Sequence, residues 1–352
     1  MTHVVAVIGA GIGAAHLEGF ANVVDRFTIK TLCDIDAGRA DTVAKAYNEL
    51  AVSTKIADVL ADPQIDIVDV CLPPHLHFET CVKALHAGKH VICEKPLVTS
   101  LNDADLLQDI CNETGRHVFP VFQYRYGLGT AQLRALLDAG LAGRCYAGSL
   151  ETHWDRPASY YDVDWRGTWV GEQGGALLGH AIHIHDLLSA ILGPVDQVFA
   201  KTATRVNDIE VEDCASLSVR MQSGALITSS VTLGCAENMS RLRLMFEGFT
   251  VESDHAPYAP AEREWRFVAR APTQQDQIDS VLCKTTTAAS GYAGLFKAIA
   301  DALDGRPGSE VTLTDGRRSL EFVTAAYASA RQNAPVALPL GTEHPLYEGW
   351  LP

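Results

Sequence analysis

Apolar and polar residues follow two different periods along the chain, and the change comes near residue 122. In the first part, short apolar runs typical of buried strands cover residues 4–8, 27–33, 67–72, 90–93 and 117–121. Stretches with helical periodicity lie between them, at 12–24, 37–50, 75–87 and 101–113, the last with Ser100 as its expected cap. Strands separated by helices of this length imply right-handed crossovers, so residues 1–122 are predicted to form a doubly wound parallel sheet, the Rossmann architecture.

The second part, residues 123–352, has the period of two that half-buried strands show. Such runs lie at 146–153, 198–204, 215–221, 225–232, 242–246 and 249–253. They predict a large, open, mainly antiparallel sheet in an α+β domain. A helical pattern lies at 130–139, and those at 292–303 and 315–331 are expected to cover this sheet or cross back, with Thr314 as the cap of the last. Residues 271–290, rich in Thr and Gln, are expected to form loops.

Composition narrows the classes of function. The 352 residues are 47% hydrophobic and 20% charged, as in ordinary globular proteins. Lysine and arginine total 28 against 43 acidic residues, and the net charge of −15 disfavours nucleic acid and acidic membranes as partners. No basic leader precedes residues 4–8, and no apolar run approaches the roughly 20 residues of a membrane span. Nine scattered cysteines without Cys-x-x-Cys spacing are typical of reduced thiols, so we expect a cytoplasmic protein.

The turn after the first strand has the chemistry of a nucleotide-binding loop. Residues 9–14 read Gly-Ala-Gly-Ile-Gly-Ala and fit the pattern Gly-x-Gly-x-x-Ala at the start of a helix. Gly9 permits the tight turn, Gly11 lets the backbone approach a pyrophosphate, and the small Ala14 lets helix and strand close up. Asp34, after the second strand, is placed to accept hydrogen bonds from an adenosine ribose. An acid there repels the 2'-phosphate of NADP, so NAD is favoured, although Arg39 nearby is a candidate for holding that phosphate.

A lysine is predicted at the mouth of a cleft. Residues 88–97 predict a helix end at Gly88, a short buried strand, and a Glu94-Lys95 pair stopped by Pro96. Ligands bind at the carboxyl ends of strands in an open parallel sheet, which makes Lys95 a candidate catalytic group. Taken alone, the same pair also fits an ordinary solvated loop.

These motifs, in this order and spacing, resemble the Gfo/Idh/MocA oxidoreductases, a family that includes glucose-fructose oxidoreductase and inositol dehydrogenases. The resemblance rests on the glycine turn, Asp34, residues 66–77 and residues 87–96, and it extends over essentially the whole chain. It implies that the sheet of the second domain pairs with another subunit, giving a homodimer or homotetramer. With the glycine turn, it gives these cofactor-binding residues: Gly9, Gly11, Ile12, Gly13, Asp34, Leu72, Pro73, His77, Glu94 and Lys95. From its residue type alone, His77 also fits a structural histidine.

Residues 174–186 form the second candidate catalytic stretch. On a helix, His180, His183 and Asp186 are three apart and lie on one face, so they are expected to converge on one cleft. His183 and Asp186 match the family's His-x-x-Asp, and the resemblance makes His183 the proton acceptor. The family's commoner pattern has an aspartate four residues before this histidine, where this chain has Gly179. His180 is the candidate to take its place, and His185 is expected only to pack.

A metal site is the alternative explanation of this histidine-rich stretch. Imidazole and carboxylate suit zinc or manganese, but the sequence offers no obvious distant ligand. A lysine and a histidine acting in proton transfer explain the same residues, so no metal is expected.

The segment 154–169 is rich in aromatic side chains, with arginines and acids between them. Aromatic faces stack on the C–H faces of sugar rings and charged groups bind hydroxyls, so a sugar or polyol substrate suits this segment. The alternative is that these aromatics anchor a loop or an interface. The candidate substrate-binding residues are Lys95, Tyr124, Arg125, Trp165, His180 and His183.

The predicted activity is reversible hydride transfer between NAD and a secondary hydroxyl of a sugar, glycoside or inositol. His183 would take the hydroxyl proton while Lys95 hydrogen-bonds the same oxygen. Two alternatives stay open: NAD-assisted cleavage of a glycoside without net NADH, and a non-catalytic, NAD-responsive regulatory protein of the same fold.

Overall fold

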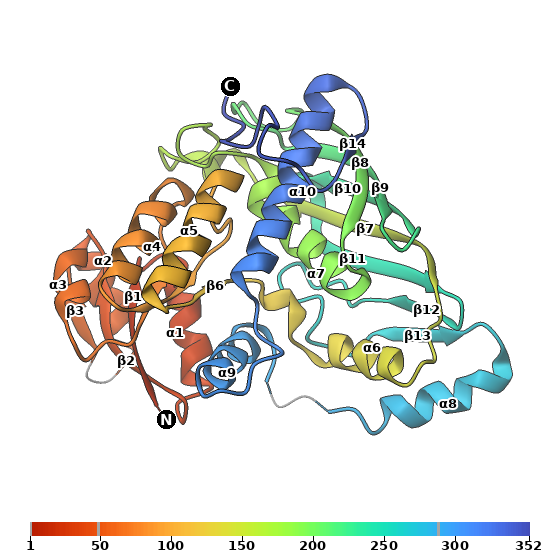
Figure 1. Ribbon diagram of the computed structural model, residues 1–352, viewed down its shortest axis with the longest axis horizontal. Helices are drawn as coiled ribbons and strands as arrows, with labels where there is room; N and C mark the ends of the chain where they lie inside the picture. Colours follow the sequence, from red (N-terminus) through yellow and green to blue (C-terminus); the bar gives the residue numbers. More distant parts are fainter. Residues whose placement is uncertain (1, 48–49, 287–288) are drawn as a thin grey trace. The chain divides into compact units, whose positions relative to one another are not determined.

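The computed structural model describes residues 2–47, 50–286 and 289–352, which form two compact units. The first unit comprises Met1–Val121 and Tyr292–Arg317, and the second comprises Phe122–Gly291 and Arg318–Pro352. Figure 1 labels their helices and strands. The sequence prediction keeps residues 292–317 in the second domain, whereas their contacts group them with the first unit.

The first unit contains the predicted doubly wound sheet. Its six strands are all parallel, in the order β3-β2-β1-β4-β5-β6. The strands are β1 (His3–Ile8), β2 (Phe27–Cys33), β3 (Ala51–Ser53), β4 (Ile67–Val70), β5 (His90–Cys93) and β6 (Val118–Pro120). The helices are α1 (Gly13–Ala21), α2 (Ala37–Ala44), α3 (Ile56–Ala61), α4 (His77–His86) and α5 (Leu101–Thr114). The sequence prediction lacks β3 and α3, because elements of three and six residues are too short to establish a period.

Helix α9 (Gly291–Leu303) packs on α1, which explains why residues from late in the chain belong to the first unit. A Cβ on Gly19 would lie 2.6 Å from Cβ of Tyr292, so only glycine permits this approach of the two helices. Beside it, the rings of Phe20 and Phe296 stack with their centres 3.8 Å apart. The sequence left two places for residues 292–303, on the second sheet or crossing back. The contacts with α1 show that this helix crosses back to the first unit.

The second unit contains a sheet of eight strands in the order β13-β12-β11-β7-β10-β9-β8-β14. Neighbouring strands are antiparallel except for β7 and β10, which confirms the mainly antiparallel prediction. The strands are β7 (Cys145–Asp155), β8 (Val195–Ala203), β9 (Cys214–Met221), β10 (Leu226–Thr232), β11 (Gly234–Phe246), β12 (Phe249–Glu252), β13 (Arg266–Ala269) and β14 (Val336–Ala337). Residues alternate between buried and exposed along β9, so one face of the sheet meets the core there. The turn between β9 and β10 contains Gly224, at φ +89°.

Four helices accompany this sheet: α6 (Leu128–Asp138), α7 (Ile182–Leu192), α8 (Pro272–Leu282) and α10 (Leu313–Gln332), the last beginning in the first unit. Helix α7 packs against β7 and β11, and α8 packs against α6 and β13 (Figure 1). Helix α7 is therefore supported by two strands of this sheet.

Two predictions about these helices were wrong. Residues 271–290 are not all loop, because α8 starts at Pro272, which suits a first helical turn, and buries Ile278. Residues 287–288 of that range lie outside the described residues, as do 48–49 of the predicted helix 37–50, which ends as α2 at Ala44. The cap of α10 is Thr312 and not Thr314, since the Thr312 hydroxyl accepts the amide of Asp315 at 3.3 Å. Ser100 caps α5 as predicted, accepting the amide of Asp103 at 2.9 Å.

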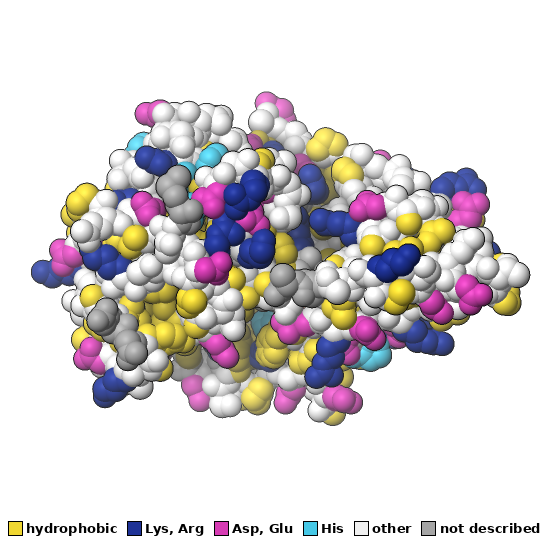
Figure 2. All heavy atoms as spheres, turned by 90° about the horizontal axis from the view of Figure 1, so that it is seen from below, with side chains coloured by type: hydrophobic (Ala, Val, Ile, Leu, Met, Phe, Trp, Pro, Cys, Tyr) yellow, Lys and Arg dark blue, Asp and Glu magenta, His cyan; other side chains and the backbone are white. Residues whose placement is uncertain are grey.

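Two further features concern the charged side chains on the surface and the state of the cysteines. On the face that Figure 2 shows, acidic and basic side chains are interspersed. All nine cysteines are free thiols, and five of them are buried. None of the helices in the described part of the chain is long and apolar enough to cross a membrane.

Candidate active site

The glycine turn between β1 and α1 has the shape of a dinucleotide cradle. Gly9 has φ +104°, and a Cβ there would lie 2.3 Å from the carbonyl oxygen of Cys71. A Cβ on Gly13 would lie 2.8 Å from Cγ1 of Val7, so helix and strand also need a glycine here. A Cβ on Gly11 would meet nothing within 4 Å. The backbone at Gly11 and at Ile12, which is 45% exposed, is therefore open to a ligand.

Asp34 closes one end of this cradle. Its Oδ2 accepts a hydrogen bond from the amide of Ala10 at 2.7 Å. The guanidinium of Arg39 donates two further hydrogen bonds to the carboxylate, at 2.7 and 3.2 Å. Burial opposes its ionisation, but these partners and the amide of Asp36 hold the pKa of Asp34 below its usual range. Its carboxylate is therefore charged and held in place next to the glycine turn.

The cradle fits an adenine dinucleotide. Open backbone at a helix N-terminus suits a pyrophosphate, and a fixed carboxylate after β2 suits ribose hydroxyls. Both features lie within one sheet of the first unit, and both were predicted from the sequence.

His77, a predicted cofactor-binding residue, is buried and bonded to the backbone of two loops. Its side chain is fully buried, with Nδ1 2.7 Å from the carbonyl oxygen of Pro96 and Nε2 2.7 Å from that of Leu72. It ties the loop after β4 to the loop after β5. Its predicted influence on a cofactor would therefore be indirect, through these loops, whereas Leu72 and Pro73 are themselves partly exposed.

Glu94 and Lys95 follow β5, as the sequence predicts, and the Lys95-Pro96 peptide bond is cis. Lys95 is half-buried, and its backbone amide donates to Oε2 of Glu94 at 3.0 Å. The other oxygen of Glu94, Oε1, lies 2.9 Å from Nε2 of His16. Glu94 is thus held from two sides at the carboxyl edge of the sheet.

His16 is the centre of a cluster that the sequence analysis missed. This fully buried imidazole lies between Glu94 and Asp69, whose Oδ2 is 2.8 Å from Nδ1. Burial opposes a charge on His16, but Asp69 and Cys71 raise its pKa well above the usual value, so the ring is an imidazolium. The signal was present in the sequence, because Asp69 is a carboxylate within a buried strand and requires a partner.

The same cluster has a geometry that also suggests a metal. Ligand atoms of His16, Asp69 and Cys71 all lie within 4.8 Å of one another. However, both ring nitrogens of His16 are directed at carboxylates, Nδ1 at 2.8 Å from Asp69 and Nε2 at 2.9 Å from Glu94, as in a hydrogen-bonded ion cluster. We therefore interpret the group as an ion cluster.

In the second unit, His180 and His183 lie on successive turns of one irregular helix. A π-helical turn, Leu177–Ala181, precedes α7, so the spacing differs from that of the regular helix assumed in the prediction. His183 is 5% exposed and stacks on Tyr124, with ring centres 4.8 Å apart. The hydroxyl of Tyr124 donates to the carbonyl of Pro257 at 2.5 Å. Tyr124, a predicted substrate-binding residue, therefore positions the ring of His183.

Asp186 and Arg125 form a buried pair. Arg125 donates to both oxygens of Asp186, at 2.6 and 2.7 Å, and the hydroxyl of Ser319 donates to one of them at 2.9 Å. Asp186 is 1% exposed. Asp186, predicted to share one cleft with His180 and His183, thus directs its carboxylate to Arg125 and Ser319. For the same reason the charge of Arg125 is not free for a substrate.

His185 packs, as expected. Its Nε2 lies 2.9 Å from the hydroxyl of Ser229, and burial lowers its pKa to about 3. His185 is thus neutral and part of the core.

Gly179, where the family's aspartate is missing, has a carboxylate beside it. A Cβ on Gly179 would lie 3.6 Å from Oε1 of Glu172. The other oxygen of Glu172 accepts the amide of Gly167 at 2.7 Å. The carboxylate near this position comes from the preceding loop, and sequence spacing could not show it.

His180 and the aromatic segment form one cluster. Nε of Arg156 donates to Nε2 of His180 at 3.2 Å, so this nitrogen of His180 carries no proton. The ring of Trp154 meets that of His180 edge-on at 5.2 Å, and Tyr160 lies 6.1 Å away. Trp165, a predicted substrate-binding residue, lies under Arg166 with 5.3 Å between guanidinium carbon and ring centre. The aromatic faces predicted to stack on sugar are thus partly covered by arginines.

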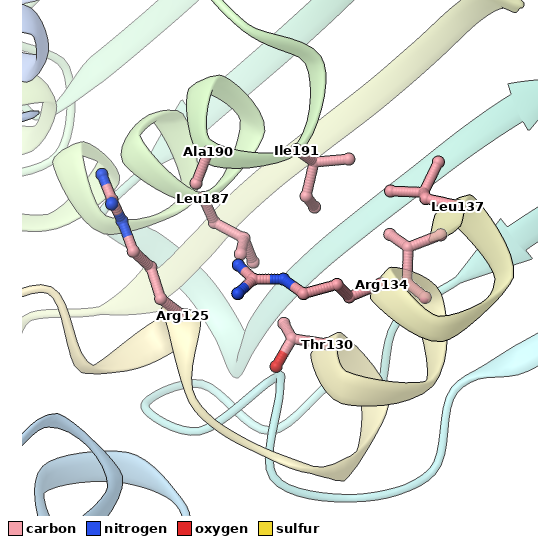
Figure 3. Close-up of a pocket in the computed structure, with 8 residues that line it drawn as sticks. Arg125, Thr130, Arg134, Leu137, Leu187, Ala190 and Ile191 are labelled. Carbon is pink, nitrogen blue, oxygen red and sulfur yellow. The ribbon is translucent and has the colours of Figure 1, made fainter. Parts of the chain in front are cut away.

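A hollow in the second unit lies apart from this cluster. Its lining residues are Arg125, Thr130, Leu133, Arg134, Leu137, Leu187, Ala190 and Ile191. Figure 3 shows that α6 and α7 supply most of them and that Arg125 extends towards α7. Apart from Arg125, the hollow contains none of the predicted site residues.

Two family models match the chain. Residues 4–122 match the oxidoreductase family, NAD-binding Rossmann fold, of the GFO/IDH/MocA group, and residues 130–252 match the GFO/IDH/MocA C-terminal domain. The chain therefore belongs to the GFO/IDH/MocA oxidoreductase family, and its first unit is an NAD-binding Rossmann domain.

Relatives of known name agree. The chain is 30% identical over 179 residues to inositol 2-dehydrogenase of Salmonella typhimurium, covering 46% of this chain and 52% of that protein. It is 29% identical over 194 residues to D-glucoside 3-dehydrogenase of Escherichia coli, covering 54% of each. The crystal structure of the WlbA dehydrogenase from Bordetella pertussis, in complex with NADH and UDP-GlcNAcA, has 28% identity and a TM-score of 0.83. That match covers 97% of this chain and 100% of the other, whereas the curated relatives are matched over about half their length.

Proposed function

We propose that this protein is an NAD-dependent dehydrogenase that oxidises a secondary hydroxyl of a sugar, glycoside or inositol. The observation that carries the proposal is the first unit, where the glycine cradle and the fixed Asp34 lie on the same sheet edge as Glu94 and Lys95. The names of the relatives, inositol 2-dehydrogenase and D-glucoside 3-dehydrogenase, support the substrate class.

Each residue has one role in the proposed reaction. Bound NAD supplies a hydride acceptor, and Gly11, Ile12 and Asp34 hold it. His183 accepts the proton of the reacting hydroxyl, and the stacked ring of Tyr124 fixes the orientation of its imidazole. Lys95 donates a hydrogen bond to the same oxygen as negative charge grows there.

NAD is the proposed cofactor in preference to NADP. Asp34 is charged, and its two contacts with Arg39 occupy the guanidinium that would otherwise receive a 2'-phosphate. NADP would have to break this pair and approach a carboxylate. A comparison of the affinities for NAD and NADP tests this preference directly.

The central test is a pair of substitutions read by two assays. Lys95→Ala is expected to abolish NADH formation with the true substrate while the affinity for NAD stays close to that of the wild type. A folded Lys95→Ala variant that loses NAD binding to the same extent would rule out a chemical role. Lys83→Ala is the matched control, since its side chain is 58% exposed on α4.

His183→Ala tests the base. We expect lost turnover at every pH with NAD binding retained, because the proposed role of His183 is to accept a proton and not to hold NAD. Wild-type turnover would exclude His183 as the proton acceptor. Absorbance at the nicotinamide band also separates the dehydrogenase from NAD-assisted glycoside cleavage, which yields no net NADH, and from a regulatory protein, which yields no product.

The predicted homodimer or homotetramer remains part of the proposal. The strands β9 and β10 expose every second residue on one face of the second sheet, which leaves a surface for pairing. Light scattering of the purified protein gives the subunit number.

A further inference from the structure

Two arginines on the segment after β7 form no ion pair with a carboxylate of the described residues. The guanidinium carbon of Arg156 lies 4.8 Å from the ring centre of Trp154 and 4.9 Å from that of Tyr160. The guanidinium carbon of Arg166 lies 3.9 Å from the ring centre of the same Tyr160. Both cations therefore contact the same aromatic side chain, Tyr160.

The partners of these arginines are neutral. Arg156, which is 9% exposed, donates to Nε2 of His180, to the hydroxyl of Tyr258 and to the carbonyl of Asp155. Arg166 donates to the carbonyl of Tyr160, while its Nε is buried without a hydrogen-bond partner among the described residues. Within the described part of the chain, neither guanidinium forms an ion pair with a carboxylate. Elsewhere in this unit Arg125 and Arg241 both do.

The acids around this segment are directed to other groups. Glu172 accepts the amide of Gly167, and Asp213 accepts three backbone amides, from residues 205–207. Asp162 and Asp164 of the segment itself are exposed to solvent. Two cations on one aromatic ring, neither ion-paired within the described residues, are unexpected in a chain with a net charge of −15, because a guanidinium cannot lose its proton when it is buried.

We propose that Arg156 and Arg166 form a subsite for a negatively charged group, a carboxylate or a phosphate, carried by the sugar substrate. The planar guanidinium fork matches the oxygens of either group and gives short, charge-assisted hydrogen bonds. The unbonded Nε of Arg166 and the remaining donors of Arg156 would supply these bonds. This inference rests on the proposed dehydrogenase function for the nature of the ligand.

The subsite is continuous with the proposed base. Arg156 bonds His180, and His180 lies one turn before His183. On the other side, Trp154 donates to the hydroxyl of Ser240 at 3.2 Å, and Ser240 and Tyr124 both donate to the carbonyl of Pro257. A charged group held by the two arginines would thus fix one end of a sugar ring in the part of the proposed active site that the second unit supplies, which contains His183.

The test compares charged and neutral ligands on the full-length protein with NAD bound. D-Glucuronate, glucose 6-phosphate and UDP-glucuronate are each titrated against D-glucose by calorimetry, and NADH formation is followed in parallel. We expect at least one anionic ligand to bind about tenfold or more tightly than glucose, with an affinity that falls as salt rises. Comparing the affinities of glucuronate and glucose 6-phosphate shows whether the subsite prefers a carboxylate or a phosphate.

Three variants locate the effect. Arg156→Gln and Arg166→Gln are each expected to raise the Kd of the preferred anion about tenfold or more, while the Kd of glucose changes less than about twofold. Arg156→Lys keeps the charge without the fork and is expected to recover part of the loss. Arg144→Gln, with a side chain 81% exposed, is the matched control and is expected to bind like the wild type. If Arg156→Gln does not fold, the half-buried Arg166 carries the test.

The outcomes separate this inference from the proposed function. Equal binding of glucose and the anionic ligands, no binding of any of them, or equal loss of both ligands in the variants would overturn the subsite. Arginine-dependent binding of an anion without NADH would leave the subsite standing and contradict the dehydrogenase. Formation of NADH from neutral sugars, without tighter binding of the anionic ligands, would support the dehydrogenase and overturn the subsite.

Discussion

The two units bury a cation in opposite ways. In the first, His16 is enclosed between Asp69 and Glu94, at 2.8 and 2.9 Å, so its charge is more than balanced. In the second, Arg156 is 9% exposed and is surrounded by Trp154, Tyr160 and neutral hydrogen-bond acceptors. In the first arrangement carboxylates of the chain neutralise the cation without a ligand, whereas the second has a guanidinium charge that a ligand can balance.

This difference indicates what each cation does. His16, from α1, joins the ends of β4 and β5, and thereby fixes Glu94 next to Lys95. Its role is to position, because it is fully buried. Arg156 hydrogen-bonds His180, one helical turn before the proposed base His183, and the role proposed for it is to bind. The predictions below test this contrast through stability, where the two cations should behave differently.

The largest effect is expected for His16→Leu. The leucine leaves Asp69 and Glu94 buried without their shared cation, and breaking a buried pair in this way costs about 3–5 kcal/mol of unfolding free energy. Urea unfolding followed by circular dichroism measures the loss.

His255→Leu is the matched control for that substitution. His255 contacts Glu252 at 3.3 Å, but its side chain is 53% exposed, so the expected change is below about 1 kcal/mol. Equal losses in the two variants would show that the His16 cluster contributes no more than a surface contact.

The second effect concerns Glu212, a buried carboxyl for which no ion pair is seen among the described residues. It accepts the amides of Gly175 and Leu177 and the hydroxyl of Tyr327, and burial raises its pKa to about 7. Unlike Arg156, it can remove its charge, by taking up a proton. In the unfolded chain it titrates near 4.5, so the native state binds more protons between pH 4.5 and 7.

Stability is therefore expected to fall as pH rises through this window, by about 3 kcal/mol in total, and to level off above it. Glu212→Gln removes the titrating group, and its unfolding free energy should lack this decline. Urea unfolding at a series of pH values measures both proteins. Parallel curves for wild type and variant would contradict the raised pKa.

The sequence predicted those features that depend on local backbone and periodicity. The glycine turn was predictable because Gly9 and Gly13 are required by contacts within one strand-turn-helix unit, and Asp34 follows the next strand. Strands such as β5 were predictable because a fully covered parallel strand is apolar throughout. Helix α8 was missed because it buries little more than Ile278, so its helical period is weak.

The charge partners could not be predicted in the same way. Asp69 and Glu94 lie 53 and 78 residues from His16 in the sequence, and only the sheet order brings them together. The aromatic segment was recognised, but which aromatic faces its arginines cover depends on side-chain packing. Asp186 was predicted on the face of His183, whereas its pairing with Arg125 decides where its carboxylate points.

A smaller effect is expected for Arg156→Met. Methionine retains the length and the apolar stem while removing a buried charge that has no carboxylate partner. Replacing such a charge by a well-packed apolar side chain is often neutral, so the unfolding free energy should stay within about 1 kcal/mol of the wild type. A loss as large as that of His16→Leu would mean that Arg156 is a structural cation and would remove the contrast between the two units. Urea unfolding of both variants under identical conditions makes this comparison.

The smallest effect is expected for Arg39→Ala, because the Arg39-Asp34 pair lies at the edge of the cradle. The side chain of Arg39 is 51% exposed, so its contact with Asp34 is largely screened by solvent. We expect the unfolding free energy to fall by less than about 1 kcal/mol, since the amides of Ala10 and Asp36 still hold the carboxylate. Urea unfolding measures the stability and calorimetry the NAD affinity, which should change less in Arg39→Ala than in Asp34→Ala. A large loss of stability in Arg39→Ala would show that the degree of burial does not govern how much a charge pair contributes in this protein.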